Sequence, residues 1–588
     1  MNPVISVGNQ DFRSIIENQY FYIDKTSFIK EWWENGDSVT LITRPRRFGK
    51  TLNMSMVETF FSNTEKDQAK LFQDLEIWKE EKYRQLQGTY PVIYLSFATV
   101  KEPDYERTRR KICQLITNLY MKYHFLIEEG FLKDKEKDFY ESISVDMDDN
   151  AATMAIYQLS DYLSRYYQKK VLILLDEYDT PLQEAYVHGY WNELSIFIRS
   201  LFNATFKTNP SLERGLLTGI TRVSKESIFS DLNNLEVVTT TSKKYETSFG
   251  FTQEEVKEAL KSFDLRDSFS KVKQWYDGFC FGEQRDIYNP WSITKYLDTK
   301  VFKPYWANTS SNQLIARLLQ QGTEDTKIKM EDLLNGKTIT EILDEEIVFE
   351  QLDESENAIW SLLLASGYLK VCEMSEHETY ILSLTNLEVM KMFGKMIYGW
   401  FSKPTVKYND FIKALKMDDI HYMNRFMNQM TEEVFSYFDT SGREPERFYH
   451  GFVLGLIADA RMDYVITSNR ESGFGRYDVL LEPKNIEDNA YIFEFKVQDS
   501  MEEKTLEETV AVALNQISEK NYDAGLLARG IKKEKIRHYG FAFCGKKINQ
   551  NEGQNSGEKY KKAKKSNNGR CGSSSWSIKD NHFEISSW

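Results

Sequence analysis

The sequence predicts an α/β protein of several domains, with a mainly parallel sheet near the N-terminus, a helical middle region and a second α/β unit near the C-terminus. Between Ser38 and Ser242, short apolar or β-branched runs alternate with longer helix-like segments, which is typical of a parallel sheet with helices on both faces. The run VLILL at residues 171–175 is apolar throughout, as a strand covered on both faces should be. The length of 588 residues also exceeds that of one ordinary domain.

Changes in this pattern suggest where the domains begin and end. After Ser242 the pattern becomes mostly helical, and Thr252 and Glu255 have the spacing of a helix capping box. The last stretch is polar, rich in Gly, Ser, Asn and Lys, and without periodicity, so we expect it to be disordered and not necessarily native. The predicted parts are a first α/β domain (1–245), a lid and helical middle region (246–440), a second α/β domain (441–547) and a tail (548–588).

Composition and charge narrow the class of protein. The net charge of -14 means that contact with nucleic acid would depend on a local basic patch rather than on the field of the whole molecule. The five cysteines include no C-x-x-C pair, which disfavours a disulfide framework or a zinc ribbon and favours a reducing cytoplasm. The N-terminus lacks the pattern of a signal peptide, and no apolar run approaches the ~20 residues of a membrane span. We therefore expect a cytoplasmic protein without a membrane partner.

A candidate nucleotide site begins in the stretch LITRPRRFGKT, residues 41–51. In a phosphate-binding loop, glycines let backbone N–H groups face the phosphates, a lysine reaches the outer phosphates, and Ser or Thr coordinates Mg²⁺. Gly49, Lys50 and Thr51 have these residue types and lie between a predicted strand and a predicted helix. Arg44, however, occupies the position of the first glycine in the G-x-x-x-x-G-K-[ST] pattern. From this loop alone, a basic surface turn before a helix remains an alternative.

A second segment supports the nucleotide site. The apolar run at residues 171–175 is followed by Asp176 and Glu177. There an aspartate could hold the water shell of Mg²⁺, and a glutamate could polarise an attacking water. The alternative is an acidic helix cap after a buried strand. Farther along, LLTGITR ends another predicted strand and puts Thr218 and Arg222 where a group that senses a γ-phosphate would lie, although threonine is common in strands.

A series of segments in order carries a family resemblance: FYIDKTSFIKEWW, LITRPRRFGKTLNMSM, LLDEYDTPL, GITRVSKESIFSDLNNL, WYDGFCFG, YNPWSI and YWANTSSN. Over residues 5–310 they resemble the bacterial AAA-ATPase-like proteins. This family has Arg-Pro-Arg-Arg-Phe-Gly-Lys-Thr in the loop, so the missing glycine is similar to the family's own pattern. Asp24 and Lys25 match the family's DKT element, to which the sequence gives no role.

The resemblance implies a P-loop NTPase domain that binds ATP and Mg²⁺ through Walker A and Walker B motifs. Glu177 would be the catalytic residue, and Thr51 and Asp176 would lie at the metal. The residues implied in nucleotide binding are Arg46, Arg47, Phe48, Gly49, Lys50, Thr51, Asp176 and Arg222.

The second α/β unit carries a candidate metal site. Phosphodiester cleavage needs carboxylates that converge on Mg²⁺ and a lysine near the attacked phosphate, and Asp478, Glu494 and Lys496 have that composition. Glu494 and Lys496 are two apart on a predicted strand, so both side chains face the same way. Asp478 lies in the preceding predicted strand, close enough across a sheet to converge with them. Solvent-facing residues of an alternating strand are the alternative, because E-x-K is a common accident.

The order helix, strand, GRYD, strand, EFK and helix resembles the PD-(D/E)xK nuclease core over residues 445–547. It is similar to the C-terminal module that accompanies the AAA-ATPase-like family, except that Tyr477 replaces the usual proline before the first acid. The resemblance implies a restriction-endonuclease-like α/β domain with metal ligands Asp478 and Glu494, which are also catalytic together with Lys496.

Further residues of this unit are secondary candidates. By the same resemblance, Gln516 and Tyr522 would support DNA or the site. Glu446, His450 and Glu471 could add ligands, or could only cap helices and pack.

Together these features predict an ATP-binding protein, an ATPase, whose first domain controls a Mg²⁺-dependent nuclease acting on nucleic acid, with DNA as the first choice. The alternative is a nucleotide-switched module whose C-terminal unit, an inactive nuclease fold, only holds nucleic acid or a protein partner. A scaffold with both sites vestigial is disfavoured by the intact motifs. A protein partner or a second copy of the chain is a further expected contact.

Overall fold

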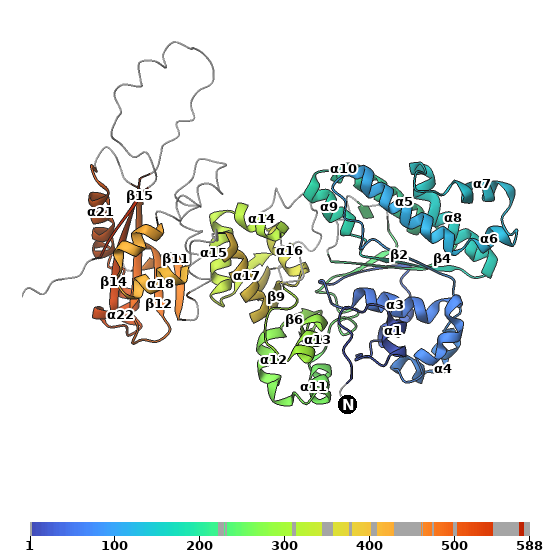
Figure 1. Cartoon of the computed structure of the whole chain (residues 1–588), viewed down its shortest axis with the longest axis horizontal. Coiled ribbons are helices and arrows are strands. Elements are labelled where there is room, and N and C mark those ends of the chain that lie inside the picture. Colours follow the sequence, from blue (N-terminus) through green and yellow to red (C-terminus); the bar gives the residue numbers. More distant parts are fainter. Residues whose placement is uncertain are drawn as a thin grey trace, which may run out of the picture. The chain divides into compact units, whose positions relative to one another are not determined.

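The structure is a computed structural model, and it divides the chain into two compact units (Figure 1). The first comprises Met1–Gly322 and Thr338–Met390, and the second comprises Thr323–Lys337 and Lys391–Trp588. The structure describes residues 3–220, 228–229, 232–307, 313–343, 357–374, 379–400, 408–427, 460, 463–472, 475–497, 503–544 and 575–580. The predicted domain boundaries remain a prediction.

The first unit is built on a five-stranded sheet in the order β2-β3-β4-β1-β5, in which every neighbouring pair is parallel. β4 lies between β1 and β3. Because these neighbouring strands are parallel, their carboxyl ends lie together at one edge of the sheet, where open α/β sheets place their ligands. The predicted parallel sheet is therefore confirmed. Its strands are β1 (Val39–Thr43), β2 (Val92–Ser96), β3 (Val171–Asp176), β4 (Leu212–Gly219) and β5 (Leu235–Val238).

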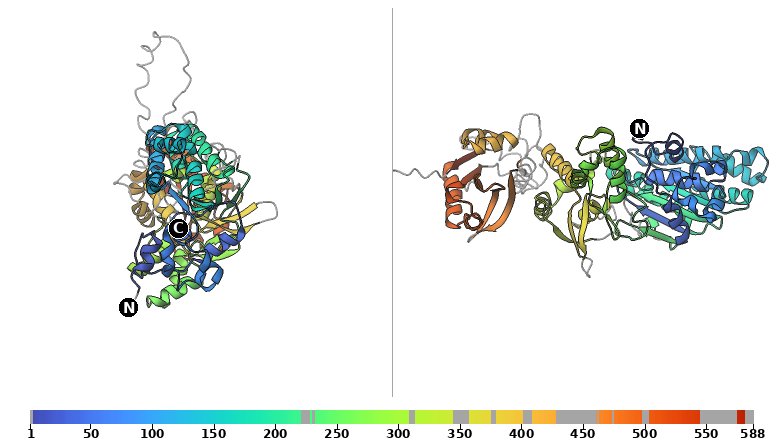
Figure 2. Two further views of the ribbon diagram at one scale, coloured as in Figure 1. Left: turned by 90° about the vertical axis from the view of Figure 1, so that its right-hand side faces the viewer. Right: turned by 90° about the horizontal axis from the view of Figure 1, so that it is seen from below.

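Helices cover both faces of this sheet, as the apolar strands require. β1 and β3 are buried at every position, which needs cover on both sides. Figure 1 shows α5, α8 and α10 on one face and α1 and α3 on the other, and Figure 2 shows the ribbon from two further directions. The helices of this part are α1 (Phe12–Glu17), α2 (Ser27–Asn35), α3 (Lys50–Phe61), α4 (Glu81–Leu86), α5 (Tyr105–Lys122), α6 (Phe125–Glu128), α7 (Asp134–Ser142), α8 (Asp149–Tyr167), α9 (Thr180–His188) and α10 (Trp191–Phe202).

The middle region is mainly helical, as predicted. Thr252 and Glu255 form the expected capping box at the start of α11. The structure adds a hairpin, β6–β7, and a three-stranded antiparallel sheet in the order β8-β10-β9, which the sequence analysis did not predict. The elements are α11 (Gln253–Ser262), α12 (Phe269–Tyr276), β6 (Phe279–Phe281), β7 (Gln284–Ile287), α13 (Pro290–Thr299), α14 (Gln313–Gln321), β8 (Ile339–Ile342), α16 (Ala358–Ala365), β9 (Leu369–Met374), β10 (Thr379–Leu384) and α17 (Leu387–Trp400).

The second unit contains a five-stranded mixed sheet in the order β11-β12-β13-β14-β15. The β13–β14 pair is parallel and the other pairs are antiparallel. Leu480, Ile492 and Ala542 on one face pack with Val510 and Leu514 of α21. The elements are α15 (Glu324–Leu334), α18 (Tyr408–Lys416), β11 (Tyr464–Ser472), β12 (Gly475–Pro483), β13 (Ala490–Val497), α21 (Leu506–Glu519), α22 (Ala524–Ala528), β14 (Ile536–Cys544) and β15 (Ser575–Asp580).

Strand β15 belongs to the stretch for which the sequence predicts a disordered tail. It pairs antiparallel with β14, from Tyr539 opposite Asp580 to Cys544 opposite Ser575. Residues 575–580 therefore form a strand through backbone hydrogen bonds to β14, which the polar composition of this stretch does not indicate. Among the described residues, no helix has the length and apolar character needed to cross a membrane.

Candidate functional site

The first candidate site surrounds the β1–α3 loop, residues 44–49. Gly49 precedes α3 as its N-cap with a left-handed φ of 85°, and no heavy atom lies within 4 Å of where its Cβ would be. Glycine adopts this conformation without strain. The first backbone N–H groups of α3 thus begin directly at the loop, and helix N-termini attract anions.

Arg44, which occupies the place of the expected first glycine, is a structural anchor. Its side chain is fully buried, and Nη1 donates to the carbonyls of Thr43 at 2.9 Å and Thr239 at 2.6 Å. The guanidinium lies 4.6 Å from the ring centroid of Phe281. Burial lowers the pKa of Arg44 to about 9. The arginine therefore fastens the start of the loop to the neighbouring segments.

Lys50 is also buried, but it points back to its own loop. Its Nζ donates to the carbonyl oxygens of Arg44 at 2.8 Å and Pro45 at 3.0 Å. Burial lowers the pKa of Lys50, while Glu177, Asp179 and Asp176 raise it in turn. The ammonium thus lies between the loop carbonyls and the acidic residues at and after the end of β3.

Asp176 connects three elements at the carboxyl edge of the sheet. Thr51 Oγ1 donates to Asp176 Oδ2 at 2.8 Å, and Thr218 Oγ1 donates to Asp176 Oδ1. Burial raises the pKa of Asp176, and the hydrogen bonds from the two threonines counteract this rise. The structure therefore brings together residues that the sequence placed in separate motifs.

Glu177, the predicted catalytic residue, follows Asp176 with a left-handed φ of 50°. Such a backbone conformation is unusual for a non-glycine residue and often marks functional sites. Its N–H donates to Thr218 Oγ1 at 3.5 Å, and its Oε2 accepts from Thr180 Oγ1 at 3.2 Å. The carboxylate is thereby held at the start of α9.

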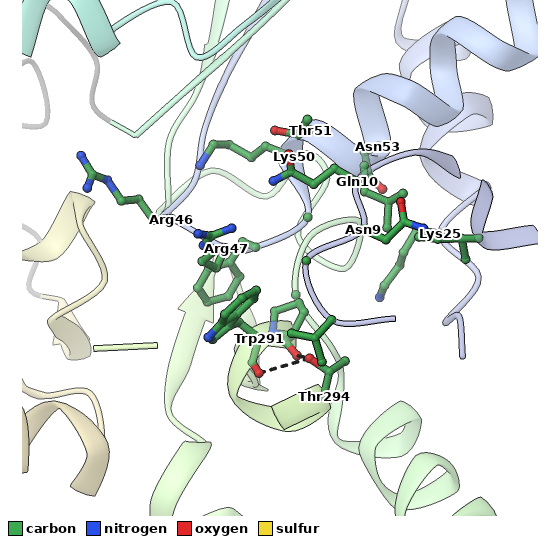
Figure 3. A pocket seen from close by; sticks show the side chains of 18 of the residues that line it. Asn9, Gln10, Lys25, Arg46, Arg47, Lys50, Thr51, Asn53, Trp291 and Thr294 are labelled. Atoms are coloured by element: carbon green, nitrogen blue, oxygen red, sulfur yellow. Dashed lines mark hydrogen bonds between the residues drawn. The ribbon is translucent and has the colours of Figure 1, made fainter. Parts of the chain in front are cut away.

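A cavity of about 400 Å³ opens beside these groups (Figure 3). The β1–α3 loop, with Lys50 and Thr51, lines it together with Glu177, the N-terminal segment 6–10 and α13. Figure 3 shows Arg47 near Trp291 of α13, and its guanidinium lies 4.5 Å from the Trp291 ring centroid. The cavity thus places cationic side chains beside an aromatic ring, a combination that suits an anionic ligand with a planar group.

The remaining loop residues have different surroundings. Arg46 lines the cavity and donates to Gln183 Oε1 at 3.2 Å. Phe48 is 1% exposed, and its ring packs against Phe279 with the centroids 4.8 Å apart. It therefore helps to anchor the loop in the hydrophobic core. Arg222 lies outside the described residues.

The Asp24 and Lys25 pair obtains a role from the structure. Lys25 Nζ lies 2.8 Å from both carboxylate oxygens of Glu255 and 2.8 Å from the carbonyl of Thr247. Asp24 Oδ1 accepts from the N–H of Thr26 at 2.8 Å. Lys25 therefore fastens the N-terminal segment to the start of α11, whereas Asp24 holds the turn before α2.

The second candidate site lies on β12 and β13. Val479 pairs with Phe493, so the next pair in this antiparallel register is Asp478 opposite Glu494, on the same face of the sheet. Phe495 N–H donates to Asp478 Oδ2 at 2.6 Å, and Lys496 Nζ lies 3.9 Å from Glu494 Oε1. The three residues predicted for this site converge.

Glu494 has the properties of a metal-ligand candidate. Burial, followed by repulsion from Asp478, raises the pKa of Glu494 to about 8. Its Oε2 is buried and has no hydrogen-bond partner in the described part of the chain. Gln516 Nε2 donates to Glu494 Oε1 and lies 3.1 Å from the Tyr522 hydroxyl, which gives both residues a positioning role.

The other predicted ligands lie outside the described part of the chain. Glu446 and His450 lie outside the described residues, and so does the side chain of Glu471 on β11. Within the described ranges, no group of three or more His, Cys, Asp or Glu side chains could hold a metal ion. Two carboxylates suffice for Mg²⁺, which commonly keeps several waters.

Comparison with known protein families bears on the two domains that carry these sites. Residues 6–229 match the family model described as "Predicted AAA-ATPase". The chain carries an AAA-ATPase-like domain. Residues 444–553 match the model of the PD-(D/E)XK nuclease superfamily, so both predicted resemblances are confirmed.

The chain is also similar to a curated protein along most of its length. This relative, described as an uncharacterized protein in the vnfD 5' region of Azotobacter chroococcum mcd 1, is 24% identical over 544 residues. The alignment covers 90% of this chain and 94% of that protein.

Sequence reasoning missed two residues that hold the loop of the AAA-ATPase-like domain. Trp306 Nε1 donates to the carbonyl of Arg46 at 2.9 Å, and Asn289 Nδ2 donates to it at 3.4 Å. The signal was present, because Asn289 lies in YNPWSI and Trp306 lies in YWANTSSN. Neither motif suggests its partner, since each is more than two hundred residues away from the loop.

Proposed function

We propose that the AAA-ATPase-like domain binds and hydrolyses ATP and thereby controls a Mg²⁺-dependent nuclease site in the C-terminal domain. The proposed ATP site is supported mainly by one observation: Thr51 and Thr218 both donate to buried Asp176, beside the cavity that Lys50 lines. Hydroxyl and carboxylate oxygens are the ligands that Mg²⁺ prefers, so this donor set fits the ion.

Four residues at the nucleotide site would bind the phosphates or position the attacking water. Lys50 leaves the loop carbonyls of Arg44 and Pro45 and neutralises the outer phosphates. Arg46 and Arg47 also line the cavity and add positive charge to it. Glu177 orients the water that attacks the γ-phosphate.

In the C-terminal domain, Asp478 and Glu494 would hold Mg²⁺, and the buried unpartnered oxygen of Glu494 supports this fit. The ion would supply an activated water and charge neutralisation at the phosphate. Lys496, whose ammonium lies 3.9 Å from Glu494, would contact the attacked phosphate. Gln516 holds the Glu494 carboxylate in place.

Control by ATP requires that the nucleotide bind differently to two conformations, because equal affinity for both shifts no population. The substrate class we propose is nucleic acid, with DNA as the first choice, in the cytoplasm. A local basic surface or a partner chain would have to attract it, given the net charge of -14.

One experiment tests this function most directly. The purified full chain is incubated with single- and double-stranded DNA and RNA, with and without Mg²⁺ and ATP. Cleavage that needs Mg²⁺ and is lost in Asp478→Ala supports the proposal. Salt-sensitive DNA binding without cleavage or metal dependence would instead favour a nucleotide-switched binding module, the second candidate.

A further inference from the structure

The β1–α3 loop of the AAA-ATPase-like domain is held from outside its own segment. The carbonyl of Arg46 accepts hydrogen bonds from Trp306 Nε1 at 2.9 Å and from Asn289 Nδ2 at 3.4 Å. Pro45 packs against Gly367, where an added Cβ would lie 2.8 Å from Pro45 Cγ. All of these supports lie beyond residue 229, where the family match ends.

Trp306 is in turn held by a buried carboxylate on α17. Glu388 is 0% exposed, and its Oε1 accepts from the backbone N–H of Trp306 at 2.6 Å and of Ala307 at 3.4 Å. Its Oε2 accepts from Ser292 Oγ at 2.8 Å. Burial raises the pKa of Glu388 to about 7, and these hydrogen bonds counteract the rise.

The hydrogen bonds of Glu388 link α13 and the β1–α3 loop, which both line the cavity. Ser292 lies on α13, whose Trp291 and Thr294 line the cavity, and Trp306 reaches the loop that carries Lys50. Glu388 thus fixes α13 and the loop relative to one another. It lies in the first turn of α17, a helix that continues past Met390, the last residue of the first unit.

The physical reason for such a support lies in the loop sequence. A glycine-rich loop can adjust its backbone to the phosphates, whereas Pro45 and Arg46 restrict it. A restricted loop must already have the right shape, and hydrogen bonds to its carbonyls can fix that shape at little further cost in entropy. Neither Glu388 nor Trp306 is among the residues that line the cavity.

We propose that Glu388 is a positioning residue for the ATP site, which through Trp306 holds the Arg46 carbonyl and keeps the loop ready for phosphate. This inference rests on the proposed binding of ATP. It implies that residues 6–229, the range matched by the family model, do not by themselves contain all the supports of the nucleotide site. It also implies that the first turn of α17 becomes more rigid when ATP binds.

The test uses the full chain with Trp306→Phe, which keeps a ring but removes the donor to Arg46, and with Glu388→Gln. Losing one such hydrogen bond should weaken ATP binding by roughly 3- to 10-fold. Calorimetry gives the dissociation constant, and steady-state assays should show KM rising by a similar factor while kcat stays within about 2-fold. Glu331→Gln is the matched control, because Glu331 is a buried carboxylate of the second unit that accepts from Ser468 Oγ.

Hydrogen exchange gives a readout that a general loss of stability would not produce. Exchange of the Trp306 and Ala307 amides should slow by about 5-fold or more when ATP binds the parent protein, and should not change in Lys50→Ala. Unchanged ATP affinity in both Trp306→Phe and Glu388→Gln would overturn the positioning role alone. Equal weakening in Glu331→Gln would overturn it too, and absence of ATP binding in the parent would overturn the proposed function with it.

Discussion

The hydroxyl of Thr51 donates a hydrogen bond of 2.8 Å to the carboxylate of Asp176, although 125 residues separate them in sequence. Thr51 lies in the first turn of α3 and Asp176 ends β3, so the bond joins two elements beside the candidate ATP cavity. A hydroxyl and a carboxylate at this point form a ready oxygen donor set for a cation.

ATP binding should depend on Lys50. Lys50→Ala removes the ammonium that would neutralise the outer phosphates, and hydrogen bonds to charged groups contribute about 1.5–3 kcal/mol, so we expect roughly 10- to 100-fold weaker binding by calorimetry. Lys30→Ala is the control, since Lys30 pairs with Glu80 on the surface. Equal ATP affinity in Lys50→Ala and the parent would refute this site.

Hydrolysis should depend on Glu177 while binding does not. Glu177→Gln keeps the shape of the side chain but cannot polarise water as a carboxylate does, so turnover should fall roughly 100-fold or more at unchanged ATP affinity. Phosphate release assays measure this rate. Glu184→Gln on α9, which removes a carboxylate paired with His188, should behave like the parent. A fast Glu177→Gln protein would mean that another group positions the water.

Metal binding in the C-terminal domain should depend on pH. The pKa of Glu494 is raised to about 8, so the carboxylate carries a proton at neutral pH when no metal is bound. Mg²⁺ must displace this proton, and its affinity should therefore rise by up to about tenfold per pH unit below 8 and level off above. Titration calorimetry between pH 6 and pH 9 measures the slope.

Two variants locate this proton. Glu494→Gln should abolish the pH-dependent binding, whereas Glu482→Gln, which only breaks an exposed pair with Arg529, should keep it. An affinity that does not vary between pH 6 and pH 8 in the parent protein would contradict the assignment of Glu494.

Nuclease activity should respond to ATP. The assay compares cleavage without nucleotide, with ADP and with ATP at fixed free Mg²⁺, because ATP chelates the ion. Lys50→Ala is the control that should not sense nucleotide, and a difference of several-fold in the parent is expected from typical coupling free energies. Equal rates under all three conditions would show two functions that are merely tethered.

Much of the fold follows from local patterns. The apolar run before Asp176 predicts a doubly covered strand, and β3 is buried throughout. The spacing of Glu494 and Lys496 predicts one face of a strand, and the register across β12–β13 adds Asp478 to that face. The small sheet β8-β10-β9 was missed, although Thr379–Leu384 alternates between buried and partly buried positions, because helical segments surround it.

The sequence by itself determined the strands that carry the two candidate sites and the residue types of each motif, because periodicity and spacing act over a few residues. Only the tertiary structure decided that Arg44 is buried as an anchor rather than placed at the phosphates. It likewise decided that Trp306 and Glu388 support the loop. A buried polar group must find a partner wherever the folded chain brings one, and that partner is fixed by packing between distant segments, which no local pattern encodes.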